Sequence, residues 1–71
     1  MAKKSNDALA FESLEKVRGR VPYSNVQLWR MEQEGRFPKR IKIGPNRVAW
    51  LTHEVDEWIN ARLEERRSQH D

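Results

Sequence analysis

Residues 24–35 read Ser-Asn-Val-Gln-Leu-Trp-Arg-Met-Glu-Gln-Glu-Gly, and this stretch decides the fold. Ser24, followed three residues later by Gln27, forms a capping box, in which the two residues satisfy each other's free backbone N–H groups. Leu28 and Met31 are three residues apart and share one side of a helix. Glycine favours the left-handed conformation that ends many helices. The pattern therefore predicts a helix that starts at the capping box and ends near residues 33–34, before Gly35.

The chain before this helix predicts a shorter helix and a turn. A helical pattern starts at Leu9, with Leu14 and Val17 three residues apart, and it is expected to stop near Gly19, where glycine favours a C-terminal cap. Pro22 disfavours helical geometry at the residue before it. Residues 20–23 are therefore expected to form the turn between the two helices.

Residues 39–51 change from a helical period to an alternation of apolar and other residues, which predicts two short strands. Between them residues 44–47, Gly-Pro-Asn-Arg, supply turn chemistry, with proline at the second position and asparagine at the third. Lys42 is expected on the solvent-facing side. A turn at this point predicts two cross-strand pairs on one face of the hairpin, Ile43 with Val48 and Ile41 with Trp50.

The segment after the hairpin predicts a third helix. Thr52 can cap it, and acidic residues follow near its positive N-terminal end. Residues 64–67 are expected to be exposed and to fray toward Asp71. An apolar stripe at helical spacing predicts packing onto the core by Val55, Trp58, Ile59 and Leu63.

The order helix, turn, helix, hairpin, helix predicts a mostly α protein with a small β-hairpin, which is the winged helix-turn-helix architecture. The expected domain spans residues 9–67, between a disordered tail over residues 1–8 and a C-terminal tail over residues 68–71. In this architecture the second helix of the pair enters the major groove of DNA, and the hairpin is the wing.

Composition limits the protein to one small domain. The chain has 71 residues, of which 37% are hydrophobic and 35% charged, and it has no cysteine for a disulfide or a zinc–thiolate site. The longest apolar run has four residues, far below the roughly 18 needed to span a membrane. The first residues lack the apolar region of a secretory signal, so we expect a cytoplasmic protein with no membrane partner.

Positive charge is concentrated in the middle of the chain. Residues 16–47 hold nine Lys and Arg against two Glu, a net charge of +7, whereas residues 1–15 carry −1 and residues 48–71 carry −3. A basic surface of this kind attracts polyanions through counterion release. Nucleic acid is therefore the simplest partner, and the winged helix-turn-helix architecture makes double-stranded DNA the expected one.

The second helix and the hairpin carry the candidate contacts to DNA. On a helix in the major groove, Arg can pair with guanine, Asn or Gln with adenine, and Val can touch the thymine methyl group. Basic residues of the hairpin are spaced to grip phosphates or to reach the adjacent minor groove. The predicted DNA-binding residues are Ser24, Asn25, Val26, Gln27 and Arg30 on the recognition helix (24–34), and Lys39, Lys42, Asn46 and Arg47 on the wing (39–50).

The three tryptophans are predicted to have structural roles. Trp50 and Trp58 are expected to anchor the core rather than to stack on single-stranded bases. Trp29 flanks the outer face of the second helix, and we expect it to seal the edge between that helix and the wing.

Catalytic and metal-binding patterns are weak. The chain has two histidines, His53 and His70, and no glycine-rich phosphate loop. His53 and Glu57 are four residues apart, but two ligands do not make a metal site. We expect no catalytic residues, no metal and no cofactor, and hence no enzyme.

Three motifs stand out, namely the Gly-x-Phe-Pro of residues 35–38, the Val-Ala-Trp of residues 48–50, and the Glu-Val-x-x-Trp of residues 54–58. Together they resemble the AlpA-type regulators of phages and prophages. The resemblance runs from about Leu14 to Arg62. It implies a small winged helix-turn-helix protein of the MerR-like and excisionase-like group, which acts as a transcriptional regulator or as an excision factor. The family's recognition helix corresponds to residues 24–34.

Three functions stay open at this point. The first is sequence-specific regulation of transcription, with RNA polymerase as a further partner. The second is an architectural excisionase that bends DNA and assists a site-specific recombinase. The third is a protein-interaction module with an incidental basic face. A base-contacting surface this small covers few base pairs, so we also expect repeated sites or self-association on DNA.

Overall fold

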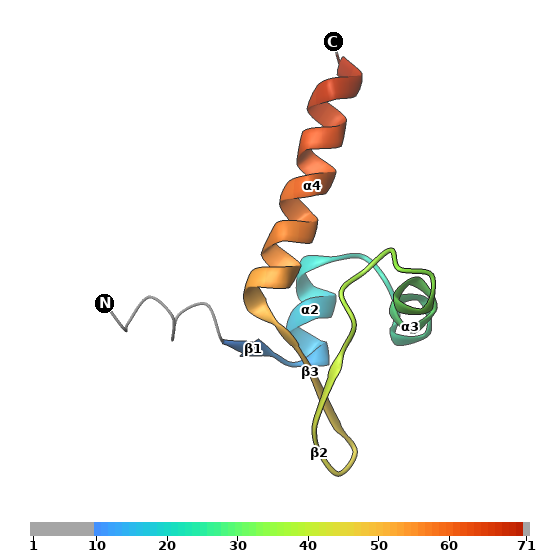
Figure 1. The fold of residues 1–71 in the computed structure, drawn as a ribbon, viewed down its shortest axis with the longest axis vertical. Helices are drawn as coiled ribbons and strands as arrows, with labels where there is room; N and C mark the ends of the chain where they lie inside the picture. Colours follow the sequence, from blue (N-terminus) through green and yellow to red (C-terminus); the bar gives the residue numbers. More distant parts are fainter. Residues whose placement is uncertain (1–9, 71) are drawn as a thin grey trace, which may run out of the picture.

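The computed structural model describes residues 10–70, with side-chain burial described up to Arg67. The predicted N-terminal tail therefore lies outside the described residues. Two short helices, a hairpin and a long helix follow one another, which confirms the predicted winged helix-turn-helix (Figure 1). In chain order the elements are β1 (Phe11–Glu12), α2 (Leu14–Arg20), α3 (Asn25–Gln33), β2 (Ile41–Gly44), β3 (Arg47–Leu51) and α4 (Thr52–His70).

The first element is a strand, which corrects the expectation that a helical pattern starts at Leu9. β1 pairs antiparallel with β3, with Phe11 opposite Leu51, and the N–H of Thr52 donates to the carbonyl of Ala10 at 2.8 Å. Ser13 then caps α2 by accepting a hydrogen bond from the N–H of Lys16 at 3.2 Å. Pairing with a distant strand therefore overrides the local helical signal.

Helix α2 ends at Arg20, close to the predicted stop near Gly19, but Gly19 lies within the helix and the predicted glycine cap is wrong. The cap is instead Val21, whose extended backbone donates back to the carbonyl of Val17. Val21 precedes Pro22, and the residue before a proline is biased toward extended geometry. The predicted turn between the two helices is thus confirmed, and proline rather than glycine explains where α2 stops.

The hairpin has the predicted turn but a different register. Asn46 has φ +56°, as the third position of a type II turn requires, and Gly44 lies opposite Arg47. An irregularity between Lys42 and Gly44 then shifts the ladder by one residue. The observed pairs are Ile41 with Ala49 and Lys42 with Val48, so the predicted pairs Ile43–Val48 and Ile41–Trp50 are wrong. Because such a shift reverses which side chains share a face, Ile43 is 47% exposed.

The core lies where both N-terminal helices meet β3 and the start of α4. It is formed by Val17, Val21, Leu28, Met31, Phe37, Trp50 and Val55. Trp50 is fully buried, and Trp58 packs against this cluster, with its ring 5.0 Å from that of Phe37 and its Nε1 donating to the carbonyl of Arg36 at 2.7 Å. Both tryptophans therefore anchor the core, as predicted.

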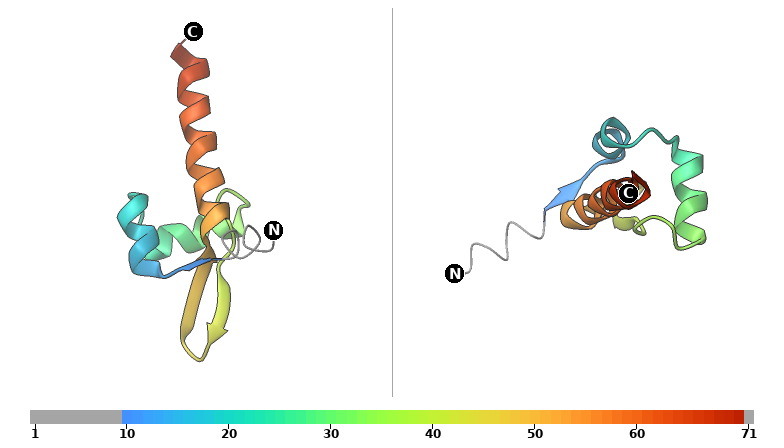
Figure 2. Two further views of the ribbon diagram at one scale, coloured as in Figure 1. Left: turned by 90° about the vertical axis from the view of Figure 1, so that its left-hand side faces the viewer. Right: turned by 90° about the horizontal axis from the view of Figure 1, so that it is seen from above.

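Helix α4 projects away from the rest of the domain, as Figures 1 and 2 show. Its first turn buries Val55, but residues 60–67 are all exposed. Leu63 is 49% exposed, which corrects its predicted place in the core stripe, because the body of the domain ends before this turn. Among the described residues no helix is long and apolar enough to span a membrane.

Candidate nucleic-acid interface

Helix α3 has an inner side in the core and an outer side in solvent. Leu28, Met31 and Glu32 are buried. On the opposite side, four exposed residues at helical spacing form a continuous face, which we call the α3 outer face: Val26, Trp29, Arg30 and Gln33. Val26 is 61% exposed, so the side chains predicted to point toward DNA are not covered by the protein.

The start of α3 is fixed by the predicted capping box. Ser24 Oγ accepts a hydrogen bond from the N–H of Gln27 at 3.2 Å, and Gln27 Oε1 accepts one from the N–H of Ser24 at 2.9 Å. Gly35 has φ +74° and ends the helix, as predicted. The side chains of Ser24 and Gln27 therefore position the helix, and a base contact by either oxygen would compete with its cap.

A buried network that the sequence did not lead us to predict ties α3 to the hairpin. Glu32 is 2% exposed. Its carboxylate accepts hydrogen bonds from Arg40 Nε at 3.0 and 3.1 Å, from the Arg40 backbone N–H at 3.2 Å, and from Trp50 Nε1 at 3.3 Å. Several satisfied bonds of this kind hold a buried charge in place. The signal in the sequence is that Glu32 lies four residues after Leu28, on the same buried stripe.

Arg40 connects three parts of the domain. Besides its ion pair with Glu32, its guanidinium lies over the Trp50 ring at 5.0 Å from the centroid. Its Nη1 donates to Asn25 Oδ1 at 2.9 Å, at the first turn of α3. Asn25, a predicted base contact, thus has its amide oxygen engaged within the protein. The contacts of Arg40 fix the position of α3 relative to β3.

Ion pairs neutralise part of the basic segment. Three of its nine bases are paired, Arg20 with Glu12 and Asp56, Arg36 with Glu34, and Arg40 with Glu32. The hydrogen bond from Arg20 to Asp56 raises the pKa of this arginine above its ordinary value, helped by the nearby Glu12. Within residues 10–67, six bases of the segment have no ion-pair partner, namely Lys16, Arg18, Arg30, Lys39, Lys42 and Arg47.

The hairpin presents the four predicted wing residues to solvent. Lys39, Lys42, Asn46 and Arg47 are all exposed. In Figures 1 and 2 the hairpin extends from the body in the direction opposite to the far end of α4, while α3 lies at the side of the body and runs across the hairpin direction. Lys42 and Arg47 thus lie on the element that extends away from the projecting half of α4, and Arg30 lies on the helix at the side of the body.

Trp29 does not close the edge between α3 and the wing, which corrects that prediction. It is 53% exposed and does not belong to the core cluster. The contact between α3 and the hairpin is made instead by Arg40, whose long side chain spans the gap to both Asn25 and Glu32. Trp29 is left on the α3 outer face, toward the flank on which Asn25 and Glu32 lie.

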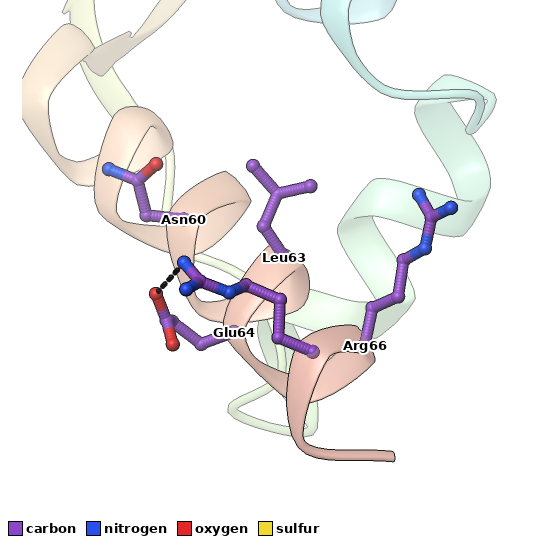
Figure 3. A pocket seen from close by; sticks show the side chains of 5 residues that line it. Asn60, Leu63, Glu64 and Arg66 are labelled. Atoms are coloured by element: carbon purple, nitrogen blue, oxygen red, sulfur yellow. Dashed lines mark hydrogen bonds and ion pairs between the residues drawn. The ribbon is translucent and has the colours of Figure 1, made fainter. Parts of the chain in front are cut away.

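Two surface hollows lie along α4 and beside α3. A hollow of about 490 Å³ along α4 is lined by Asn60, Leu63, Glu64, Arg66 and Arg67, and it contains the ion pair between Arg67 and Glu64 (Figure 3). A smaller one of about 310 Å³ lies beside α3, between Tyr23 and Arg36. Among the described residues no group of three or more His, Asp or Glu could hold a metal ion.

One of two comparisons with known proteins found a match. A family model described as prophage CP4-57 regulatory protein (AlpA) matches residues 14–63, which is 50 of the 71 residues. The matched segment contains both short helices, the whole hairpin and the part of α4 that packs on the body. A search of curated proteins found no match.

Proposed function

The chain belongs to the AlpA family of prophage regulatory proteins, and from this premise we propose that it regulates transcription by binding a specific sequence of double-stranded DNA. In the proposed complex α3 lies in the major groove with its outer face toward the bases. The hairpin lies on the adjacent backbone or minor groove. We propose that the protein acts in the cytoplasm, on the DNA that it binds there.

The observation that carries the proposal is the way α3 is held. Its inner side is tied to the hairpin through Glu32, Arg40 and Trp50, while its outer face is left to solvent. A side chain that reads a base must be held by a rigid scaffold, because small displacements break its hydrogen bonds. An exposed helix face beside an exposed basic hairpin fits the two contacts that a winged helix-turn-helix protein makes with one duplex.

The predicted residues divide into three roles. Arg30 and Val26 are proposed to contact base edges, since neither is engaged elsewhere in the described structure. Ser24, Gln27 and Asn25 are proposed to approach the backbone at the start of α3 while they hold it in place. The wing residues are proposed to contact phosphates or the minor groove, and they are Lys39, Lys42, Asn46 and Arg47.

Salt dependence of duplex binding tests the proposal. Duplexes selected by the protein from a random pool are titrated at several KCl concentrations, and binding is followed by fluorescence anisotropy. If four to six of the unpaired bases neutralise phosphates, log affinity falls with log salt with a slope of about −4 to −5. Weak binding with little response to salt would favour a protein-interaction module instead.

A double variant of the wing sharpens this test. Lys42→Ala with Arg47→Ala should weaken binding to every duplex and flatten the salt slope by about two units, because two phosphate contacts are lost. The control is Arg66→Ala with Arg67→Ala, which removes the same charge from the projecting half of α4. Equal effects of the two pairs would mean that net charge, not the wing, drives binding.

The excisionase alternative is separated by the shape of the bound DNA. A regulator needs only to occupy its site, whereas an architectural factor bends the duplex and raises recombinase activity. Circular permutation of a selected site measures the bend, and a recombination assay with the integrase of the same element measures assistance. RNA polymerase, a recombinase and a second copy of the chain are proposed partners on the DNA.

A further inference from the structure

The α3 outer face combines cationic chemistry with an apolar pair. The exposed large hydrophobic residues of the described chain are Phe11, Val26, Trp29, Ile43 and Leu63. Val26 and Trp29 are the two of these that lie on α3, and at a spacing of three residues they are neighbours on the helix surface. Single exposed hydrophobic residues are ordinary, but an adjacent pair on the face proposed to meet a ligand calls for an explanation.

Trp29 differs from the other two tryptophans. Trp50 lies against Arg40 and bonds to Glu32, and Trp58 packs on Phe37 and Tyr23. Trp29 makes no ring contact within residues 10–67, although its ring is the largest apolar group on α3. Its exposure therefore serves neither the core nor the network.

The surrounding charge identifies the partner that this pair would meet. Arg30 follows Trp29 directly and lies four residues after Val26, and it has no ion-pair partner in the described structure. The unpaired bases Lys39, Lys42 and Arg47 lie on and next to the hairpin. A polyanion complements this charge. In the major groove of DNA the apolar group on the base edges is the 5-methyl group of thymine.

We infer that Val26 and Trp29 form an apolar contact surface for thymine methyl groups, and that they make thymine a determinant of the target sequence. The inference rests on the proposed function, and it adds Trp29 as a specificity-determining residue beside Arg30. Arg30 would select guanine by hydrogen bonds, while the apolar pair would select a neighbouring thymine by burying its methyl group.

Deoxyuridine tests the inference, because it differs from thymidine only in lacking this methyl group. A site is first selected by the wild-type protein from a random duplex pool, and each thymine is then replaced by deoxyuridine, one at a time. Replacement at the contacted positions should weaken binding about fourfold, the effect expected from losing one buried methyl-sized group. All other positions should change little.

Variants assign the effect to the two side chains. The double variant Val26→Ala with Trp29→Ala should bind the thymine and deoxyuridine sites equally, because both apolar partners of the methyl group are gone, and each single variant should reduce the fourfold preference. The matched control is Leu63→Ala, which removes an exposed apolar side chain from α4 and should keep the fourfold preference for thymine. Since all three side chains are exposed, the fold should persist, and thermal melting followed by circular dichroism verifies it.

The outcomes separate this inference from the proposed function. A selected site with salt-dependent binding but no sensitivity to deoxyuridine would overturn the inference and leave the DNA-binding regulator standing. A preference for thymine that survives undiminished in the double variant would also overturn it. If no duplex is selected and binding does not respond to salt, the proposed function itself fails, and the inference with it.

Discussion

Helices α3 and α4 are held in place in different ways. The nine residues of α3 are too few for a stable isolated helix in water, but its inner side is buried and bonded to Arg40. Helix α4 has 19 residues, and beyond residue 60 its described side chains are exposed, with ion pairs only along the helix itself. Tertiary contacts thus fix the short helix in place, whereas length alone supplies no such fixation.

Removing the carboxylate of the network should have the largest effect. Glu32→Ala leaves the buried donors of Arg40 and Trp50 unpaired, and breaking a buried ion pair in this way costs about 3–5 kcal/mol. Urea denaturation measures the free energy of unfolding. The control Glu34→Ala removes an exposed pair with Arg36 and should change stability by less than about 1 kcal/mol. Equal losses would mean that burial of Glu32 does not fix α3.

Truncating one leucine on each helix compares the two directly. Leu28 is fully buried in α3, and Leu28→Ala should cost about 2–5 kcal/mol through lost burial and a cavity. Leu63→Ala on the exposed part of α4 should stay within about 0.5 kcal/mol. Thermal melting of both variants provides the measurement. A large loss from Leu63→Ala would show that the far half of α4 is covered in solution.

Arg30→Ala should change DNA affinity and not stability, because this residue lies on the solvent side of α3. It should cost about 1–3 kcal/mol on a selected site and relax discrimination at one base pair, while leaving stability unchanged. Binding to the selected site and to each of its single-base variants measures this. A uniform loss on every sequence would assign Arg30 to a phosphate instead.

Substituting two glycines by alanine should give the smallest changes in the free energy of unfolding, and the two changes should have opposite signs. Gly35→Ala forces a side chain into φ +74° at the end of α3 and should destabilise by about 1 kcal/mol. Gly19→Ala lies within α2, where a Cβ meets no atom within 4 Å, and should stabilise by about 0.5–1 kcal/mol. Chemical denaturation distinguishes the two. If Gly19→Ala destabilised the protein, the prediction that this glycine ends the helix would stand after all.

Local signals predicted those features whose physical cause lies within a few residues. The capping box at Ser24, the left-handed Gly35 and the turn at Pro45 and Asn46 are short-range geometry, and each is found where expected. The exposure of Val26 and Arg30 followed from helical periodicity in the same way. The order of the helices and the hairpin, and with it the fold class, could therefore be predicted.

The remaining features depend on contacts between distant residues. Strand β1 has two residues and exists because it pairs with β3 almost 40 positions later. The register of the hairpin changes at an irregularity that alternation does not reveal. Of the nine bases counted as one positive region, three are neutralised by partners that charge counting cannot assign. The same reason explains why the network of Glu32 and the exposure of Trp29 were missed.

The division of α3 into two sides has a consequence for how such regulators diversify. None of the four side chains of the α3 outer face belongs to the core cluster, the capping box or the network around Arg40. These four residues can therefore be substituted together without loss of the contacts that hold α3 in the domain. Exchanging them should therefore change what α3 contacts, while the free energy of folding stays nearly the same.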